Sequence, residues 1–395
     1  MKVNIIVLSD NILMGKRPCP NLIEQKCIQK GMYINKKLIF PSYQPDLYDI
    51  LKNENDCVNI LLVDNEFARV NEVMCQLAND TLQENQNIKE AVTNFYKFKN
   101  VPIEKQVSEQ WMIPAHGRAV ICENSAYQGY ILKCEREDNV VLPLENYETL
   151  FNVVIDNVWI SSAKCNIFKT FGLNESNVKS LIGEYIRNKD GIKINFSFNG
   201  LETDIIIKGK KQDKLEEYTK NIFEKLSKFV YAESDLNIYS VAFKILQANN
   251  LTISFAESVT GGNLVGNFVK YNKGASNVLN QSFVTYSNEA KINILGVNEM
   301  TLRDKGAVSV ETAYEMALGL LKKGCDIAVV TTGYVGEESN GESYIAIGDK
   351  NAIHVYKNIF CMQRENAIDN ICKAANFYLI KKLRSNDFYF DKNNV

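Results

Sequence analysis

Short apolar runs alternate with polar, helix-like segments along the first 165 residues. Four runs have the length of a buried strand: residues 3–8, 58–63, 119–122 and 140–142. Two segments repeat apolar positions at helical spacing: residues 22–30 and 86–97. Strands that alternate with helices are typical of a parallel, layered sheet, so the pattern predicts an α/β domain over residues 1–165.

The pattern changes between residues 166 and 235. Residues 192–198 alternate apolar and polar positions with a period of two, and Asn199-Gly200 predicts a hairpin turn before a returning strand at residues 203–208. Helical spacing flanks this hairpin on both sides, at residues 175–187 and 215–230. We therefore expect a small α+β unit of helix, hairpin and helix.

Helices and strands alternate again from residue 236 to the end of the chain, which predicts a compact α/β domain. The expected helices are residues 238–248, 261–269, 312–322 and 365–383. The expected strands are residues 251–255, 282–287, 327–332, 343–347 and 354–360.

The composition restricts the function classes. The chain has 395 residues and a formal net charge of -2, which gives no electrostatic reason to expect nucleic acid or an acidic membrane as the main partner. No run of eighteen apolar residues predicts a membrane span, and the N-terminal apolar run is too short for a signal peptide. The ten cysteines are scattered without a C-x-x-C pair, which indicates reduced thiols in a cytoplasmic protein and neither a disulfide frame nor a zinc site.

Histidine is scarce, and the two present, His116 and His354, lie in ordinary loop and strand contexts. A catalytic base is therefore expected among lysine, tyrosine and carboxylate side chains.

The segment F-A-E-S-V-T-G-G, residues 255–262, joins an expected strand to an expected helix. The N–H groups at a helix start have no intrahelical partner, and two glycines let a ligand approach them closely. Ser258 would thus have oxyanion-stabilising donors beside it. The alternative is that Ser258 or Thr260 only caps the helix.

Two further segments carry candidate chemistry. Tyr286 lies near an expected strand end and Lys291 at the start of the next helix, where a lysine desolvated beside a serine can be neutral and act as a base. The alternative is a solvated lysine and a half-buried tyrosine. Residues 329–336 run from a buried strand into a loop with two glycines, which either places N–H groups over an anion or only forms a turn.

Together these segments resemble the CinA family of competence-damage-inducible proteins and the related nicotinamide-nucleotide amidases. The family motifs are A-E-S-C-T-G-G, V-x-Y-S-N-E-A-K-x-x-x-L-G-V, H-G-A-V-S and T-G-I-A-G-P. Their counterparts here are residues 256–262, 284–297, 305–309 and 332–337. The resemblance implies an α/β amidase domain over residues 236–395.

The resemblance extends upstream. F-G-L-N-E-S at residues 171–176 resembles the start of the family's KH-like unit, which implies a KH-like α+β unit over residues 166–235. This unit lacks the G-x-x-G loop that KH domains use to bind RNA, so no nucleic-acid partner is expected. The resemblance also implies that residues 1–165 are a degenerate molybdopterin-binding-like domain. It rests there on N-I-L-M-G at residues 11–15 and on Gly129, Tyr130, Pro143 and Glu148.

The chain also departs from the family. The family's T-G-G-L-G-P-T-x-D-D loop would follow residues 58–63, where this chain has a glycine-free, acidic segment at residues 64–69. Such a segment cannot wrap a diphosphate, so the metal-dependent hydrolysis of ADP-ribose-type diphosphates by relatives is not expected here. In the C-terminal domain, Val259 replaces the motif cysteine and Glu337 the proline of the last loop.

The resemblance implies hydrolysis of the carboxamide of nicotinamide mononucleotide, with Ser258 as nucleophile, Lys291 as base and Tyr286 near it. The implied substrate-binding residues are Thr260, Gly261 and Gly262, whose amides would stabilise the oxyanion, with Gly333 and Arg364. Arg364 matches a family arginine and would face a phosphate, or is a solvated residue at a helix start. No metal or organic cofactor is expected, and neither is a membrane partner.

We expect a homo-oligomer, a dimer, that acts on a small nucleotide. The alternative function is a catalytically inactive scaffold that binds a nucleotide or a partner protein. Loss of the first domain's motif favours this alternative, whereas retention of Ser258, Tyr286 and Lys291 together opposes it.

Overall fold

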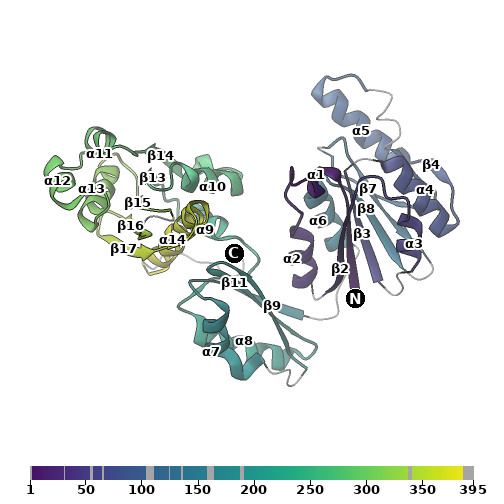
Figure 1. The fold of residues 1–395 in the computed structure, drawn as a ribbon, viewed down its shortest axis with the longest axis horizontal. Coiled ribbons are helices and arrows are strands. Elements are labelled where there is room, and N and C mark those ends of the chain that lie inside the picture. Colours follow the sequence, from purple (N-terminus) through teal and green to yellow (C-terminus); the bar gives the residue numbers. More distant parts are fainter. Residues whose placement is uncertain are drawn as a thin grey trace. The chain divides into compact units, whose positions relative to one another are not determined.

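The computed structural model describes residues 2–30, 32–53, 57–64, 66–103, 111–123, 125–134, 137–157, 164–186, 191–336 and 340–385. The fold is mixed α/β, as the hydrophobic pattern predicts (Figure 1). The chain divides into two compact units. The first comprises Met1–Cys165 and Lys208–Gln212, and the second Asn166–Ile207 and Asp213–Val395.

The first unit is built on a sheet with the strand order β2-β1-β3-β8-β7-β6. Its strands are β1 (Lys2–Leu8), β2 (Tyr33–Phe40), β3 (Cys57–Val63), β6 (Arg118–Val120), β7 (Gly129–Lys133) and β8 (Asp138–Pro143). β1, β2, β3 and β8 run parallel, but β6 and β7 are antiparallel to their neighbours. The expectation of a parallel sheet is therefore corrected to a mixed one, because too few residues separate β7 from β8 for a crossover.

Helices cover both faces of this sheet. Side chains of β1 alternate between them: Val3, Ile5 and Val7 face one core, and Ile6 and Leu8 face the other. The first core is closed by α2 (Leu22–Gln29) and α6 (Tyr147–Asn157), and the second by α3 (Leu47–Lys52), α4 (Phe67–Ala78) and α5 (Gln86–Lys99). The remaining elements are α1 (Asp10–Leu13), β4 (Leu82–Glu84) and β5 (Met112–Pro114).

The middle of the chain forms a separate sheet with the order β10-β11-β9-β12, packed against two helices. These elements are β9 (Lys164–Phe171), α7 (Glu175–Ile186), β10 (Lys193–Asn199), β11 (Glu202–Gly209), α8 (Gln212–Leu226) and β12 (Val230–Ala232). The expected hairpin is present, but the helix expected to reach residue 230 ends at Leu226. Val230 begins a buried strand that pairs with β9, and so short a segment has no periodicity of its own.

The C-terminal sheet has the order β14-β13-β15-β16-β17. Its strands are β13 (Ile253–Glu257), β14 (Leu279–Val284), β15 (Ile327–Gly333), β16 (Glu342–Gly348) and β17 (Ile353–Ile359). β14 and β15 flank β13 in parallel, and β16 and β17 add to the sheet in antiparallel order. The carboxyl ends of β13, β14 and β15 therefore meet at one edge, where ligands bind in sheets of this kind.

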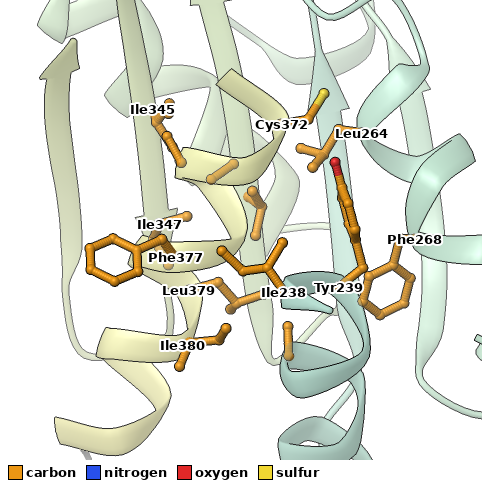
Figure 2. Packing of buried hydrophobic residues seen from close by; sticks show 14 of the residues in the cluster. Ile238, Tyr239, Leu264, Phe268, Ile345, Ile347, Cys372, Phe377, Leu379 and Ile380 are labelled. Atoms are coloured by element: carbon orange, nitrogen blue, oxygen red, sulfur yellow. The ribbon is translucent and has the colours of Figure 1, made fainter. Parts of the chain in front are cut away.

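Two helical layers enclose this sheet. Phe255 and Val329 face α9 (Ile238–Ala248), α10 (Asn263–Tyr271) and α14 (Arg364–Ser385). Ala256 and Val330 face α11 (Asn288–Leu295), α12 (Glu299–Lys305) and α13 (Val310–Leu321). Figure 2 shows the core between the C-terminal sheet and α9, α10 and α14. Ile238 and Tyr239 of α9 lie there among side chains of α10, β16 and α14.

The middle sheet shares contacts with α14. The rings of Phe171 and Phe377 lie 5.3 Å apart, and Arg384 donates to the carbonyl oxygens of Val230 and Tyr231 at 3.1 and 2.6 Å. These contacts place the middle segment in the same compact unit as the C-terminal sheet. The division into three separately folding units stays a prediction. Among the described residues, no helix is long and apolar enough to cross a membrane.

Candidate active site

Ser258 follows β13 directly and lies at the sheet edge where three parallel strands end. Its N–H donates to the carbonyl oxygen of Thr331 on β15 at 2.9 Å, which fixes the backbone of the turn against the neighbouring strand. The Ser258 residue is only 8% exposed. A strand-to-helix turn thus presents a nearly buried hydroxyl at the position that the sequence predicts.

Lys291 reaches Ser258 from α11. Ser287 caps this helix by accepting from the N–H of Ala290 at 3.0 Å, and Lys291 lies in the first turn. The Lys291 Nζ lies 3.1 Å from Ser258 Oγ, 2.8 Å from the carbonyl oxygen of Thr285 and 3.2 Å from that of Tyr286. Lys291 is 1% exposed, so its amine is enclosed by the protein.

These surroundings favour the neutral form of the lysine. Burial lowers the pKa of Lys291 from its ordinary 10.5 to about 8. A neutral amine has two N–H donors and one lone pair, and the two carbonyl oxygens can only accept. The two N–H groups therefore match Thr285 and Tyr286, which leaves the lone pair to accept the hydroxyl proton of Ser258.

The pair lies in a cavity of about 250 Å³. Its lining comes from the Ser258 turn, the start of α11, the loop before α13, the end of β15 and the start of α14. The residues are Ser258, Val259, Tyr286, Lys291, Ala307, Val308, Thr332, Gly333, Tyr334, Val335 and Arg364. Thr332 donates to the carbonyl oxygen of Ala307 at 2.7 Å and so holds the loop before α13 against β15.

Tyr286 and Arg364 meet at this cavity. The Arg364 guanidinium donates to the carbonyl oxygen of Val335 at 3.0 Å and to the phenol oxygen of Tyr286 at 3.3 Å. Arg364 thus lines the cavity although the residue is exposed, and its role toward a phosphate stays a prediction. The Tyr286 side chain is 61% exposed and points to Arg364, whereas its backbone carbonyl contacts Lys291.

Thr260, Gly261 and Gly262 do not line the cavity, although the sequence predicts them as substrate-binding residues. The N–H of Gly261 donates to the carbonyl oxygen of Ser258 at 3.1 Å, and that of Gly262 to the carboxylate of Glu257 at 2.9 Å. Thr260 is fully buried. The two glycine N–H groups already donate inside the turn, so this geometry does not support them as oxyanion donors, and the role of the Thr260 amide stays a prediction.

The structure gives these glycines and Gly333 steric roles. Gly262 precedes α10 with a φ of +98°, a conformation that favours glycine. A Cβ on Gly333 would lie 2.7 Å from the Cβ of Ser343, so only glycine lets β15 pack this closely on β16. Gly333 also lines the cavity, and its role in substrate binding stays a prediction.

Glu257 is a functional candidate that sequence reasoning missed. It is 1% exposed, and its carboxylate accepts four hydrogen bonds from the turn and the start of α10. An acidic residue at the end of an apolar strand, directly before the serine, was the available signal. It was overlooked because an acidic residue beside a turn is usually solvated.

The two histidines lie away from this cavity, whereas Val259 lines it. His116 is exposed in the first unit beside Asp80, and His354 is exposed on β17. Val259, which replaces the family cysteine, is a buried apolar residue. Within the described part of the chain, no group of three or more His, Cys, Asp or Glu side chains could hold a metal ion. Glu337, the other departure in this domain, lies outside the described residues.

The segment at residues 64–69 lies at the carboxyl end of β3 in the first unit. Asp64 accepts from the Ser9 hydroxyl at 2.8 Å and from the Asn11 amide at 3.0 Å, and Arg17 lies 3.9 Å away. The carboxylate of Asp64 is thus held by side chains of its own unit. Asn65 lies outside the described residues.

Comparison with known proteins extends this description. The family model described as the CinA C-terminal domain matches residues 236–383. A competence-damage inducible protein of Caldicellulosiruptor saccharolyticus is 29% identical over 325 residues, covering 77% of this chain and 78% of that protein. A protein of the same name from Clostridium beijerinckii is 31% identical over 284 residues, covering 68% of each chain.

Among solved structures, a CinA superfamily protein from Klebsiella pneumoniae is 28% identical. The match covers 38% of this chain and 99% of that chain, with a TM-score of 0.36. The matches to the two sequence relatives cover 78% and 68% of those proteins, at 29% and 31% identity. The chain therefore belongs to the CinA family.

Proposed function

We propose that this protein hydrolyses the carboxamide of nicotinamide mononucleotide to nicotinic acid mononucleotide and ammonia. The observation that carries the proposal is the 3.1 Å approach of Lys291 Nζ to Ser258 Oγ inside a cavity. A serine becomes a nucleophile when an adjacent base accepts its proton, and a lysine with a lowered pKa is such a base.

In the first half of the reaction, Ser258 Oγ attacks the amide carbon while its proton passes to Lys291. The resulting ammonium protonates the amide nitrogen of the tetrahedral intermediate, the C–N bond breaks and ammonia leaves. In the second half, water attacks the ester on Ser258 and gives a proton to Lys291. That proton returns to Ser258 Oγ as the carboxylic acid leaves, so neither half calls for a metal ion or an organic cofactor.

The developing oxyanion needs a donor other than the glycine amides. The N–H of Val259 belongs to a cavity-lining residue directly after the nucleophile, and no described residue accepts a hydrogen bond from it. An unpaired amide next to the nucleophile is the usual position of such a donor. We assign oxyanion stabilisation to Val259 on this ground.

The cavity lining supports a charged, planar substrate. Tyr286 and Tyr334 both line it and are 61% and 56% exposed, so their rings are accessible to a ligand. A pyridinium ring is flat and cationic and is attracted to aromatic faces. Arg364 contributes a guanidinium group at the same cavity, which suits the phosphate of a mononucleotide.

The test is ammonia release from nicotinamide mononucleotide by the purified protein and by its Ser258→Ala variant. We expect turnover by the parent and a rate at least about a hundredfold lower in the variant, because loss of a nucleophile removes the covalent path. Ser254→Ala is the matched control. Ser254 lies near the opposite end of the same strand, is 1% exposed and accepts from the N–H of Gln281.

Retention of more than about a hundredth of the parent rate in Ser258→Ala would refute the nucleophile assignment. Absence of ammonia release from the parent would favour the inactive scaffold. Under that alternative, binding of the mononucleotide without turnover would be detected by calorimetry.

A further inference from the structure

The carboxylate of Glu257 is buried directly beside the nucleophile without entering the cavity. Its Oε2 accepts from the Thr260 hydroxyl at 2.7 Å and from the N–H groups of Gly262 and Leu264 at 2.9 and 3.0 Å. Its Oε1 accepts from the N–H of Val265 at 2.8 Å. The Glu257 side chain thus connects the turn after β13 to the start of α10 by hydrogen bonds.

This arrangement explains how a carboxylate can lie in the core. Burying a charged group is costly unless hydrogen bonds compensate it, and Glu257 accepts four. The first N–H groups of a helix lack intrahelical partners and favour a negative charge. Gly262 offers α10 no side-chain cap, so Glu257 caps the helix from the preceding strand.

The backbone of Glu257 connects the same turn to the lysine. Its carbonyl oxygen accepts from the N–H of Thr285 at 2.7 Å, and the carbonyl oxygen of Thr285 in turn contacts Lys291 Nζ at 2.8 Å. On the other side, the Thr260 hydroxyl lies 2.7 Å from that of Thr331, whose carbonyl oxygen holds the N–H of Ser258. Both members of the Ser258–Lys291 pair are therefore tied to Glu257 through short chains of hydrogen bonds.

We propose that Glu257 is a positioning residue that holds the Ser258 hydroxyl within hydrogen-bonding reach of the Lys291 amine. This inference rests on the proposed function, since it assigns Glu257 to the same serine and lysine. Glu257 does not line the cavity, so it acts through the turn and makes no contact with the substrate.

Glu257→Gln is the variant that tests the proposal. Glutamine keeps the size of the side chain and one acceptor oxygen, but its NH₂ group would face an N–H donor where the second carboxylate oxygen now accepts. We expect the turn to shift, kcat to fall by about 10- to 100-fold and KM to stay within about twofold. A small displacement of a nucleophile affects the chemical step far more than substrate binding.

Asp349→Asn is the matched control. Asp349 is another buried carboxylate of the same unit, 8% exposed, and it accepts from the N–H groups of Asn351 and Ala352 at 2.8 and 2.9 Å. It also pairs with Lys382 at 2.9 Å and lies in the turn between β16 and β17, outside the cavity lining. We expect Asp349→Asn to lower stability while leaving kcat unchanged.

A fluorophosphonate that labels activated serines separates this proposal from the identity of the substrate. The measurement is the pH dependence of Ser258 labelling, with the modified residue identified by mass spectrometry. In the parent and in Asp349→Asn we expect the rate to rise through the titration of Lys291. In Glu257→Gln we expect labelling to be at least tenfold slower, with this pH dependence weakened.

The outcomes distinguish the two proposals. Labelling of the parent without release of ammonia would contradict the proposed substrate, while the labelling of Glu257→Gln would still decide the role of Glu257. Equal labelling rates and pH profiles for the parent and for folded Glu257→Gln would refute positioning. Absence of Ser258 labelling in the parent would overturn both proposals.

Discussion

The amine of Lys291 lies in surroundings that oppose its positive charge. It is enclosed beside Ser258, and burial lowers its pKa to about 8. Because only the neutral amine can accept the serine proton, activity is predicted to rise with pH up to about 8 and then to level off. The measurement is the pH profile of kcat/KM, which reports on groups of the free enzyme.

The control for this profile is the double variant His116→Gln, His354→Gln. Neither histidine lines the cavity, so the profile should keep its acidic limb. Loss of that limb in the double variant alone would show that a histidine is the base and that Lys291 is wrongly assigned.

Lys291 is also expected to lower stability at neutral pH. Its pKa is about 8 in the folded protein and 10.5 when unperturbed, so between these values the unfolded chain binds more protons than the folded one. The unfolding free energy of the parent should therefore rise with pH, by about 2 kcal/mol between pH 7 and pH 9.5. Lys291→Met lacks this group and should lack the corresponding rise.

Urea denaturation of the parent and of Lys291→Met at pH 7 and pH 9.5 measures this difference. Groups that titrate equally in both proteins cancel in the comparison. An equal change in both would mean that the lysine pKa is not lowered, whatever the effect of the variant on activity.

At the scale of elements, a row of asparagines crosses the parallel strands of the first unit. Asn4 of β1, Asn59 of β3 and Asn139 of β8 are paired in register and buried. Asn4 donates to Asn59 at 2.9 Å, and Asn59 donates to Asn139 at 3.0 Å. A one-residue slip of any of these strands would break the row, so it specifies the register as well as stabilising the sheet.

Replacing the central member should therefore destabilise the first unit. In Asn59→Leu the side-chain oxygen of Asn139 loses its donor inside the core, which costs about 1–3 kcal/mol. The measurement is thermal unfolding followed by circular dichroism, with ammonia release assayed at 25 °C to show that the C-terminal unit still functions. Asn53→Leu is the surface control, since Asn53 is exposed and its side chain donates to the carbonyl oxygen of Asp49 at the end of the same helix. Equal melting temperatures for the two variants would show that the row contributes no net stability.

At the scale of the whole molecule, the two units are expected to differ in activity. The carboxylate of Asp64 is held by Ser9 and Asn11, and the segment after β3 lacks the glycines that would wrap a diphosphate. We predict no release of AMP from ADP-ribose with Mg²⁺ or Mn²⁺, in the same preparation that releases ammonia from the mononucleotide. Release of AMP by the parent that is absent in Asp64→Ala would overturn this prediction, because the variant excludes a contaminating hydrolase.

The sequence alone predicted the class of fold and the position of most elements. Strands such as β1, β3, β13 and β15 are apolar runs of strand length, and hydrophobic periodicity is a local property of the chain. Ser258 and Lys291 were found because strand-to-helix turns place functional groups at a sheet edge, and because their motifs resemble a known family.

Tertiary structure decided what depends on neighbours distant in sequence. Pairing with β9 makes Val230–Ala232 a strand, and the short connection between β7 and β8 makes the first sheet mixed. The parallel arrangement of β13 and β14 brings Lys291 to Ser258. The Gly262 N–H, which the sequence predicts as an oxyanion donor, donates to the Glu257 carboxylate instead. Register and hydrogen-bond partners are non-local, since each N–H donates to the acceptor that the fold brings nearest, and periodicity carries no information about that choice.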